Sequence, residues 1–120
     1  MGTFYNSRVL EWFECGRTEW LRTRGVPYAE MEERGFFLPI VESHVKYQGR
    51  ARYDDLLAVA TSADFIGRAR VRFDVTVSHE AEGSPVASGY TVHAIANAAG
   101  KPVRPPEWLV KALAREEKSP

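Results

Sequence analysis

The chain has 120 residues, and its 16 basic and 16 acidic side chains give no formal net charge, which disfavours a dedicated nucleic-acid binder. Its single cysteine, Cys15, excludes an intrachain disulfide and a cysteine-based zinc cluster. No apolar run reaches the roughly 18 residues of a membrane span, and no secretory signal is visible, which predicts a soluble, cytoplasmic protein without a membrane partner. The length suits one domain with one hydrophobic core over residues 1–120.

A helix is predicted over residues 6–24. Apolar positions recur there at the spacing of one helix face, at Val9, Phe13, Gly16 and Trp20. A glycine inside a helix costs about 1 kcal/mol relative to alanine. Gly16 on this face therefore indicates that another stretch of backbone passes close to the helix.

After residues 27–34, which are expected to form a loop, the apolar residues follow a two-residue period that is typical of strands. The period is clearest where Val71, Phe73, Val75 and Val77 alternate with polar side chains. Such alternation indicates an antiparallel sheet with one buried and one solvated face. The predicted strands cover residues 36–48, 55–66, 68–79 and 86–98.

Turn residues and prolines mark the remaining connections. Residues 80–85 favour a hairpin loop and residues 97–101 a turn. Pro105 and Pro106 suit the first turn of a C-terminal helix over residues 106–117. One long helix followed by four strands predicts an α+β fold in which a curled antiparallel sheet wraps around a central helix. The free edges of such a sheet need covering, which favours a homodimer or homotetramer.

Three segments carry a resemblance to a known family. The first segment matches the family in the spacing of a glycine, a tyrosine, an aromatic residue, an acidic residue and Arg-x-Glu, at Gly2, Tyr5, Trp12, Glu14, Arg17 and Glu19. Tyr53-Asp54-Asp55 looks like the family's entry to its second strand, and residues 100–105 resemble its closing segment. Through these segments nearly the whole chain resembles the hotdog-fold acyl-CoA thioesterases of the 4-hydroxybenzoyl-CoA thioesterase type.

The resemblance implies a hotdog fold and the hydrolysis of acyl-CoA thioesters. In such a mechanism a helix N-terminus polarises the thioester carbonyl, and a carboxylate acts as base or nucleophile. By resemblance, the donors would be the backbone N–H groups of Asn6 and Tyr5, and Glu14 is the candidate carboxylate in the cleft. The alternative for Glu14 is a surface ion pair with Arg17, three residues later.

The chain departs from the family at its start. The family's catalytic Asp stands three residues before the glycine that matches Gly2, so it would fall just before residue 1. Either a first strand and this Asp lie upstream, or the protein lacks the usual base and is a non-catalytic acyl-CoA or acyl-carrier-protein binding module. Asp54 and Asp55 are expected to form a turn rather than to act in catalysis.

Coenzyme A carries phosphates, so the resemblance also implies a cationic rim, and the planar fork of arginine suits phosphate oxygens. The candidate side chains are Arg68 and Arg70 at a strand start, with Lys101 and Arg104 as a second cluster. The alternative is that these four charges are only solvated.

No cofactor is expected. Metal ligands have to converge on one point, whereas His44, His79 and His93 lie on separate predicted strands. The histidines are therefore expected to be structural, and no metal site is predicted. Cys15 is expected to be a small packing residue of the helix.

Overall fold

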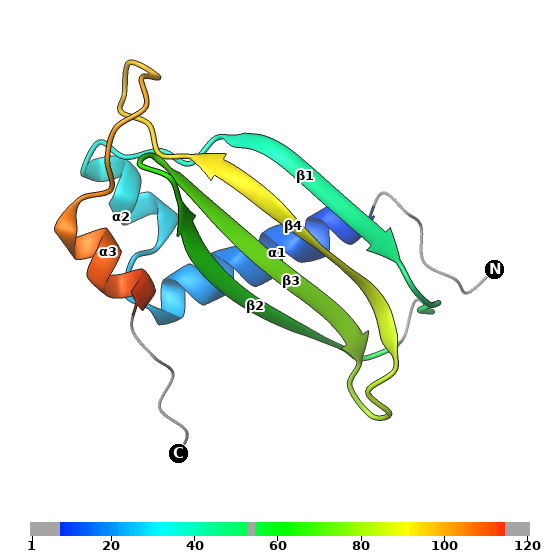
Figure 1. The fold of residues 1–120 in the computed structure, drawn as a ribbon. Helices are drawn as coiled ribbons and strands as arrows, with labels where there is room; N and C mark the ends of the chain where they lie inside the picture. Colours follow the sequence, from blue (N-terminus) through cyan, green and yellow to red (C-terminus); the bar gives the residue numbers. More distant parts are fainter. Residues whose placement is uncertain (1–7, 53–54, 115–120) are drawn as a thin grey trace.

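The computed structural model describes residues 8–52 and 55–114. Figure 1 shows a sheet that curves across one long helix, with two shorter helices gathered at one end of the sheet. The elements in chain order are α1 (Arg8–Thr23), α2 (Tyr28–Glu33), β1 (Ile40–Tyr47), β2 (Leu57–Ile66), β3 (Arg70–His79), β4 (Pro85–Ala94) and α3 (Glu107–Ala114). The predicted α+β architecture, a curled sheet around one long helix, is confirmed.

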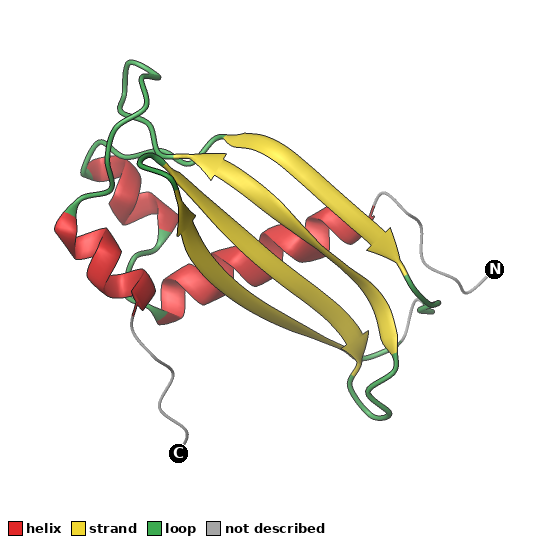
Figure 2. Ribbon diagram, in the orientation of Figure 1, coloured by secondary structure: helices red, strands yellow, loops and turns green. Residues whose placement is uncertain are grey.

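The four strands form one antiparallel sheet in the order β1-β4-β3-β2. The strands β2, β3 and β4 follow one another as hairpins, whereas β1 pairs with the last strand, β4. Figure 2 shows α1 lying along one face of this sheet. The strands β1 and β2 are the two edges of the sheet, so each has one side without a ladder partner among the described residues.

The core lies between α1 and the inward face of the sheet. Val9 and Phe13 of α1 are fully buried against Val75 and Val77, and further along the helix Leu21 joins a second cluster. Each such side chain contributes about 1.5–3 kcal/mol of hydrophobic free energy. The alternation predicted for the third strand is confirmed, because its four inward apolar side chains are each no more than 1% exposed.

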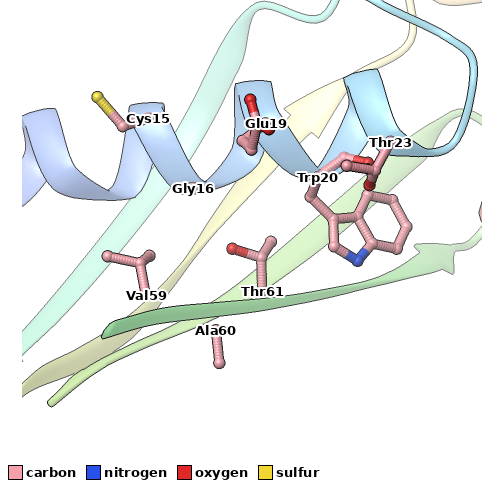
Figure 3. Close-up of a pocket in the computed structure, with 8 residues that line it drawn as sticks. All are labelled: Cys15, Gly16, Glu19, Trp20, Thr23, Val59, Ala60 and Thr61. Carbon is pink, nitrogen blue, oxygen red and sulfur yellow. The ribbon is translucent and has the colours of Figure 1, made fainter. Parts of the chain in front are cut away.

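Gly16 sits where α1 approaches the edge strand β2. A Cβ atom added to this glycine would lie 2.6 Å from Cγ1 of Val59 and 2.8 Å from Oγ1 of Thr61. Figure 3 shows both side chains pointing from β2 toward the helix. The close approach predicted at Gly16 is therefore present, but the neighbours are side chains of a strand rather than its backbone.

Some local predictions are wrong. The expected loop at residues 27–34 contains the short helix α2, whose buried Met31 anchors it to the core. Cys15 is exposed on α1 rather than packed. The last strand ends at Ala94, because Ala96 forms only isolated bridges. None of the helices within the described ranges has the length and hydrophobicity of a membrane span.

Candidate active-site cavity

A cavity of about 220 Å³ lies between the first half of α1 and the neighbouring strands β1 and β4. The helix contributes one wall because its residues at positions 10, 11, 14 and 17 recur at helical spacing. The strands contribute the other wall, where Ser43 of β1 pairs with Thr91 of β4. The complete lining is Leu10, Glu11, Glu14, Arg17, Ile40, Ser43 and Thr91.

Glu14, the candidate carboxylate, lines this cavity from the helix. The alternative of an ion pair with Arg17 is not what the structure shows, because Arg17 directs its hydrogen bonds to Tyr28 and Thr91 instead. Among the described residues, no carboxylate lies within 4 Å of the Arg17 guanidinium. The carboxylate of Glu14 and the cation of Arg17 therefore share one cavity without forming an ion pair.

A buried polar network supports the cavity wall. Nε of Arg17 donates to the Tyr28 hydroxyl at 2.7 Å, and Nη1 of Arg17 lies 3.5 Å from Oγ1 of Thr91. The Thr91 hydroxyl lies 2.9 Å from Nε2 of His93, whose Nδ1 lies 2.8 Å from the carbonyl oxygen of Leu38. Because a carbonyl only accepts, Nδ1 of His93 carries the proton and Nε2 accepts from Thr91.

Burial sets the protonation state of this network. His93 is 1% exposed, and its desolvation, assisted by the charge of Arg17, lowers its pKa to about 4. Burial also raises the pKa of Tyr28, although the neighbouring Arg17 opposes the shift. Near neutral pH His93 is thus uncharged, and it joins the Thr91 hydroxyl to the backbone carbonyl of Leu38 through two hydrogen bonds.

Ser43, Thr91 and Tyr28 belong to the site but were not predicted there from the sequence. A signal was available for Thr91 and His93, because they occupy inward positions of a strand whose other inward residues are small. Two polar side chains at such positions indicate a buried hydrogen-bonded pair. For Ser43 and Tyr28 the sequence contains no comparable signal.

The other histidines and Asp55 have local roles. His44 stacks on Tyr90 with ring centroids 5.3 Å apart. Asp55 closes a turn, because its carboxylate accepts from the backbone N–H of Arg52 at 2.6 Å, and its Oδ2 lies 3.7 Å from Nδ1 of His79. Within the described part of the chain, no three acidic, histidine or cysteine side chains converge as metal ligands would.

Tyr5 and Asn6, the predicted backbone donors, lie outside the described residues, as does Asp54. The described part of α1 begins at Arg8. Glu14 lies in the first half of this helix, so the cavity is on the side of the helix N-terminus. The oxyanion site stays a prediction.

The four predicted coenzyme A ligands are all exposed and do not line the cavity. Arg68 lies in the turn between β2 and β3, and Arg70 opens β3 opposite Ala94, the last residue of β4. Lys101 and Arg104 follow in the segment after β4. The topology thus brings the two basic clusters together where β4 ends, the same end of the sheet at which Ile40 of the cavity pairs with His93.

A larger hollow of about 400 Å³ lies between α1 and the edge strand β2 (Figure 3). Cys15, Gly16 and Glu19 line it from the helix, and Val59 and Thr61 line it from the strand. Glu19 is paired with Arg22 on the helix surface. This hollow has a carboxylate already engaged in an ion pair, so it is a weaker candidate for acid–base chemistry than the cavity at Glu14.

Comparison with known proteins is consistent with this fold. The family model described as "Thioesterase-like superfamily" matches residues 1–113. The chain is 33% identical over 61 residues to a Bacillus subtilis protein named "Putative acyl-CoA thioesterase YneP", an alignment that covers 51% of this chain and 44% of that protein. The chain thus aligns with less than half the length of this relative.

Solved structures extend the similarity over most of the fold. A hypothetical protein from Aquifex aeolicus superimposes with a TM-score of 0.85 at 28% identity, covering 93% of this chain and 86% of that one. A DHNA-CoA thioesterase from Staphylococcus aureus superimposes with a TM-score of 0.78 at 27% identity, covering 87% and 70%. This chain belongs to the thioesterase-like superfamily and has the hotdog fold that the sequence predicts.

Proposed function

We propose that this protein hydrolyses acyl-CoA thioesters at the cavity lined by Glu14. The observation that carries the proposal is a carboxylate on the wall of a cavity beside α1, in a chain of the thioesterase-like superfamily. The names of the Bacillus subtilis and Staphylococcus aureus relatives support coenzyme A thioesters as the substrate class.

In the proposed reaction, Glu14 takes a proton from water while the water oxygen attacks the thioester carbonyl carbon. Collapse of the tetrahedral intermediate breaks the C–S bond, and the proton held by Glu14 passes to the leaving sulfur, so coenzyme A is released as the thiol with a carboxylic acid as the other product. Alternatively, the Glu14 carboxylate attacks the carbonyl itself and expels coenzyme A as the thiolate, which takes a proton from water, and a second water then hydrolyses the resulting anhydride to regenerate Glu14. The backbone N–H groups of Tyr5 and Asn6 would stabilise the oxyanion, and each well-placed donor typically contributes roughly 3–4 kcal/mol.

The basic end of the molecule is the proposed place for the coenzyme A phosphates. Arg68, Arg70, Lys101 and Arg104 are exposed there and offer cations of the kind that bind phosphate. Along β4, Thr91 of the cavity wall lies three residues, about 10 Å, before Ala94, which pairs with Arg70. An extended ligand is needed to reach both places within one chain, and a second copy could supply either one.

Substitution of Glu14 by glutamine tests this function. Loss of a general base costs roughly 10²- to 10⁴-fold in rate, so we expect kcat to fall within that range on a panel of short acyl-CoAs. Release of thiol is measured against an enzyme blank that corrects for Cys15. Glu33→Gln, an equivalent change at an exposed position of α2, is the matched control and should leave the rate unchanged.

The outcomes separate the two functions considered for this family member. Full activity of Glu14→Gln would exclude this carboxylate as the base. Binding of coenzyme A by the unchanged protein without turnover of any acyl-CoA would identify a non-catalytic binding module instead.

A further inference from the structure

Arg17 is a buried cation with unused hydrogen-bonding capacity. It is 5% exposed and lines the cavity beside Glu14. A guanidinium has five N–H donors, and within the described residues its acceptors are the Tyr28 hydroxyl at 2.7 Å and the Thr91 hydroxyl at a long 3.5 Å. The remaining donors have no protein acceptor in the described part of the chain.

Such an arrangement leaves donors available to a ligand atom. No Arg17 nitrogen is among the buried side-chain atoms of the described residues that lack a hydrogen-bond partner, so these donors open onto the cavity, where a ligand oxygen can replace water as their acceptor. The cavity is the open space next to this guanidinium, so an acceptor placed in the cavity is the group that would satisfy it. We infer that Arg17 binds a neutral oxygen of the acyl group, a hydroxyl or keto oxygen beyond the thioester carbonyl. The inference rests on the proposed function and adds the substrate class.

The other residues of the cavity decide between a neutral and a charged oxygen. Glu11 and Glu14 line the same small space, so a carboxylate on the acyl group would meet two like charges. A hydroxyl or keto oxygen accepts from the guanidinium without that repulsion. The hydroxyls of Ser43 and Thr91 on the opposite wall can bond to the same polar group.

The geometry also fixes Arg17 in place before any substrate binds. Tyr28 holds its Nε, and Thr91, which contacts its Nη1, is itself bonded to the buried His93. A donor held in this way loses little conformational entropy when it binds a ligand. Arg17 is thus a specificity-determining residue.

Pairs of acyl-CoAs that differ in one oxygen test the inference. For the unchanged protein, we expect kcat/KM for 3-hydroxybutyryl-CoA to exceed that for butyryl-CoA by roughly 10- to 100-fold, as for a hydrogen bond to a charged group. Arg17→Met keeps an unbranched stem and removes the donors, so this ratio should fall toward one. Arg22→Met, at an exposed position five residues further along α1, should retain the ratio.

Several results would overturn the inference. One is a ratio near one for the unchanged protein, and another is an unchanged ratio in Arg17→Met. A preference for succinyl-CoA over pentanoyl-CoA would identify a carboxylate as the ligand and contradict the neutral oxygen. If Arg17→Met does not fold, as judged by circular dichroism, Thr91→Val takes its place and should lower the same ratio. An unchanged ratio in Thr91→Val would then count against the subsite.

Failure of the proposed function is distinguishable from failure of this subsite. If no acyl-CoA is hydrolysed, the enzyme proposal fails, and the subsite is tested by calorimetric titration with the thioethers S-(3-hydroxybutyl)-CoA and S-butyl-CoA. Tighter binding of the hydroxylated thioether, lost in Arg17→Met, supports the subsite. Equal affinities overturn it.

Discussion

His93 makes the stability of this protein sensitive to mild acid. Its pKa in the folded protein is about 4, whereas an unfolded histidine titrates near 6.5. Above pH 6.5 both states are neutral, so the residue contributes no pH dependence. Between pH 6.5 and 4 only the unfolded state takes up the proton, so stability falls as the pH falls. By linkage the loss between pH 7 and pH 5 is up to about 2 kcal/mol.

His93→Gln should remove this acid sensitivity, because glutamine can donate to Leu38 and accept from Thr91 without titrating. Urea unfolding at pH 7 and pH 5 measures the effect. The free energy of unfolding of the unchanged protein should drop more steeply than that of the variant. His44→Gln, a histidine on the exposed face of the sheet, should keep the steep drop. Parallel pH profiles of His93→Gln and the unchanged protein would contradict a neutral buried histidine.

The close packing of α1 against β2 depends on the absence of a side chain at Gly16. Overpacking costs about 1–3 kcal/mol, which outweighs the roughly 1 kcal/mol by which a helix prefers alanine. We therefore expect Gly16→Ala to lower the free energy of unfolding by about 1 kcal/mol. The added methyl group would meet Cγ1 of Val59 at 2.6 Å, so Val59→Ala should make room for it.

A double-mutant cycle tests this packing, with the free energy of unfolding of each variant measured by urea denaturation. In the Val59→Ala background, Gly16→Ala should lower the free energy of unfolding by less, since the contact with Cγ1 of Val59 is gone and only that with Oγ1 of Thr61 remains. Cys15→Ala, at the exposed neighbouring position, is the control and should change stability by less than about 0.5 kcal/mol. If Gly16→Ala stabilises both backgrounds equally, the helix does not lie this close to the strand.

On the scale of the whole molecule, the two edge strands of the sheet have no ladder partner on their outer sides among residues 8–52 and 55–114, and β1 is the more apolar of them in its exposed side chains. Ile40 is 54% exposed, and Val41 and Tyr47 are each 47% exposed. We expect a homodimer that pairs through β1, because an unpaired apolar edge favours association. A lysine at position 41 would place a charge in that interface, so Val41→Lys should weaken dimerisation at least about 10-fold.

Sedimentation velocity over a concentration series checks this expectation. Ala81→Lys, in the turn between β3 and β4, adds the same charge away from both edges and should leave association unchanged. If Val41→Lys leaves the dimer intact but Ala58→Lys on β2 dissociates it, the interface lies at the β2 edge instead. A monomer at every concentration would contradict the expected assembly.

Much of this architecture was predictable because short-range patterns determine it. The alternation through Phe73 and Val75 defined the buried face of the sheet, and the helix stripe through Phe13 defined its partner. The helix α2 has six residues, too few for a periodic pattern to be recognised. The cavity depends on Ser43 and Thr91, which become neighbours only through the β1–β4 ladder. Contacts between residues so far apart in sequence leave no local pattern.

The strand order has a consequence for how the chain acquires its structure during synthesis. Because β1 pairs with β4, the ribosome has to release residues 85–94 before residues 40–47 can find their partner. Pairings between distant residues form slowly, whereas the β2–β3–β4 meander consists of local hairpins. The nascent chain therefore carries β1 unpaired until β4 has been released, and the cavity wall between β1 and β4 forms after the β2–β3 hairpin.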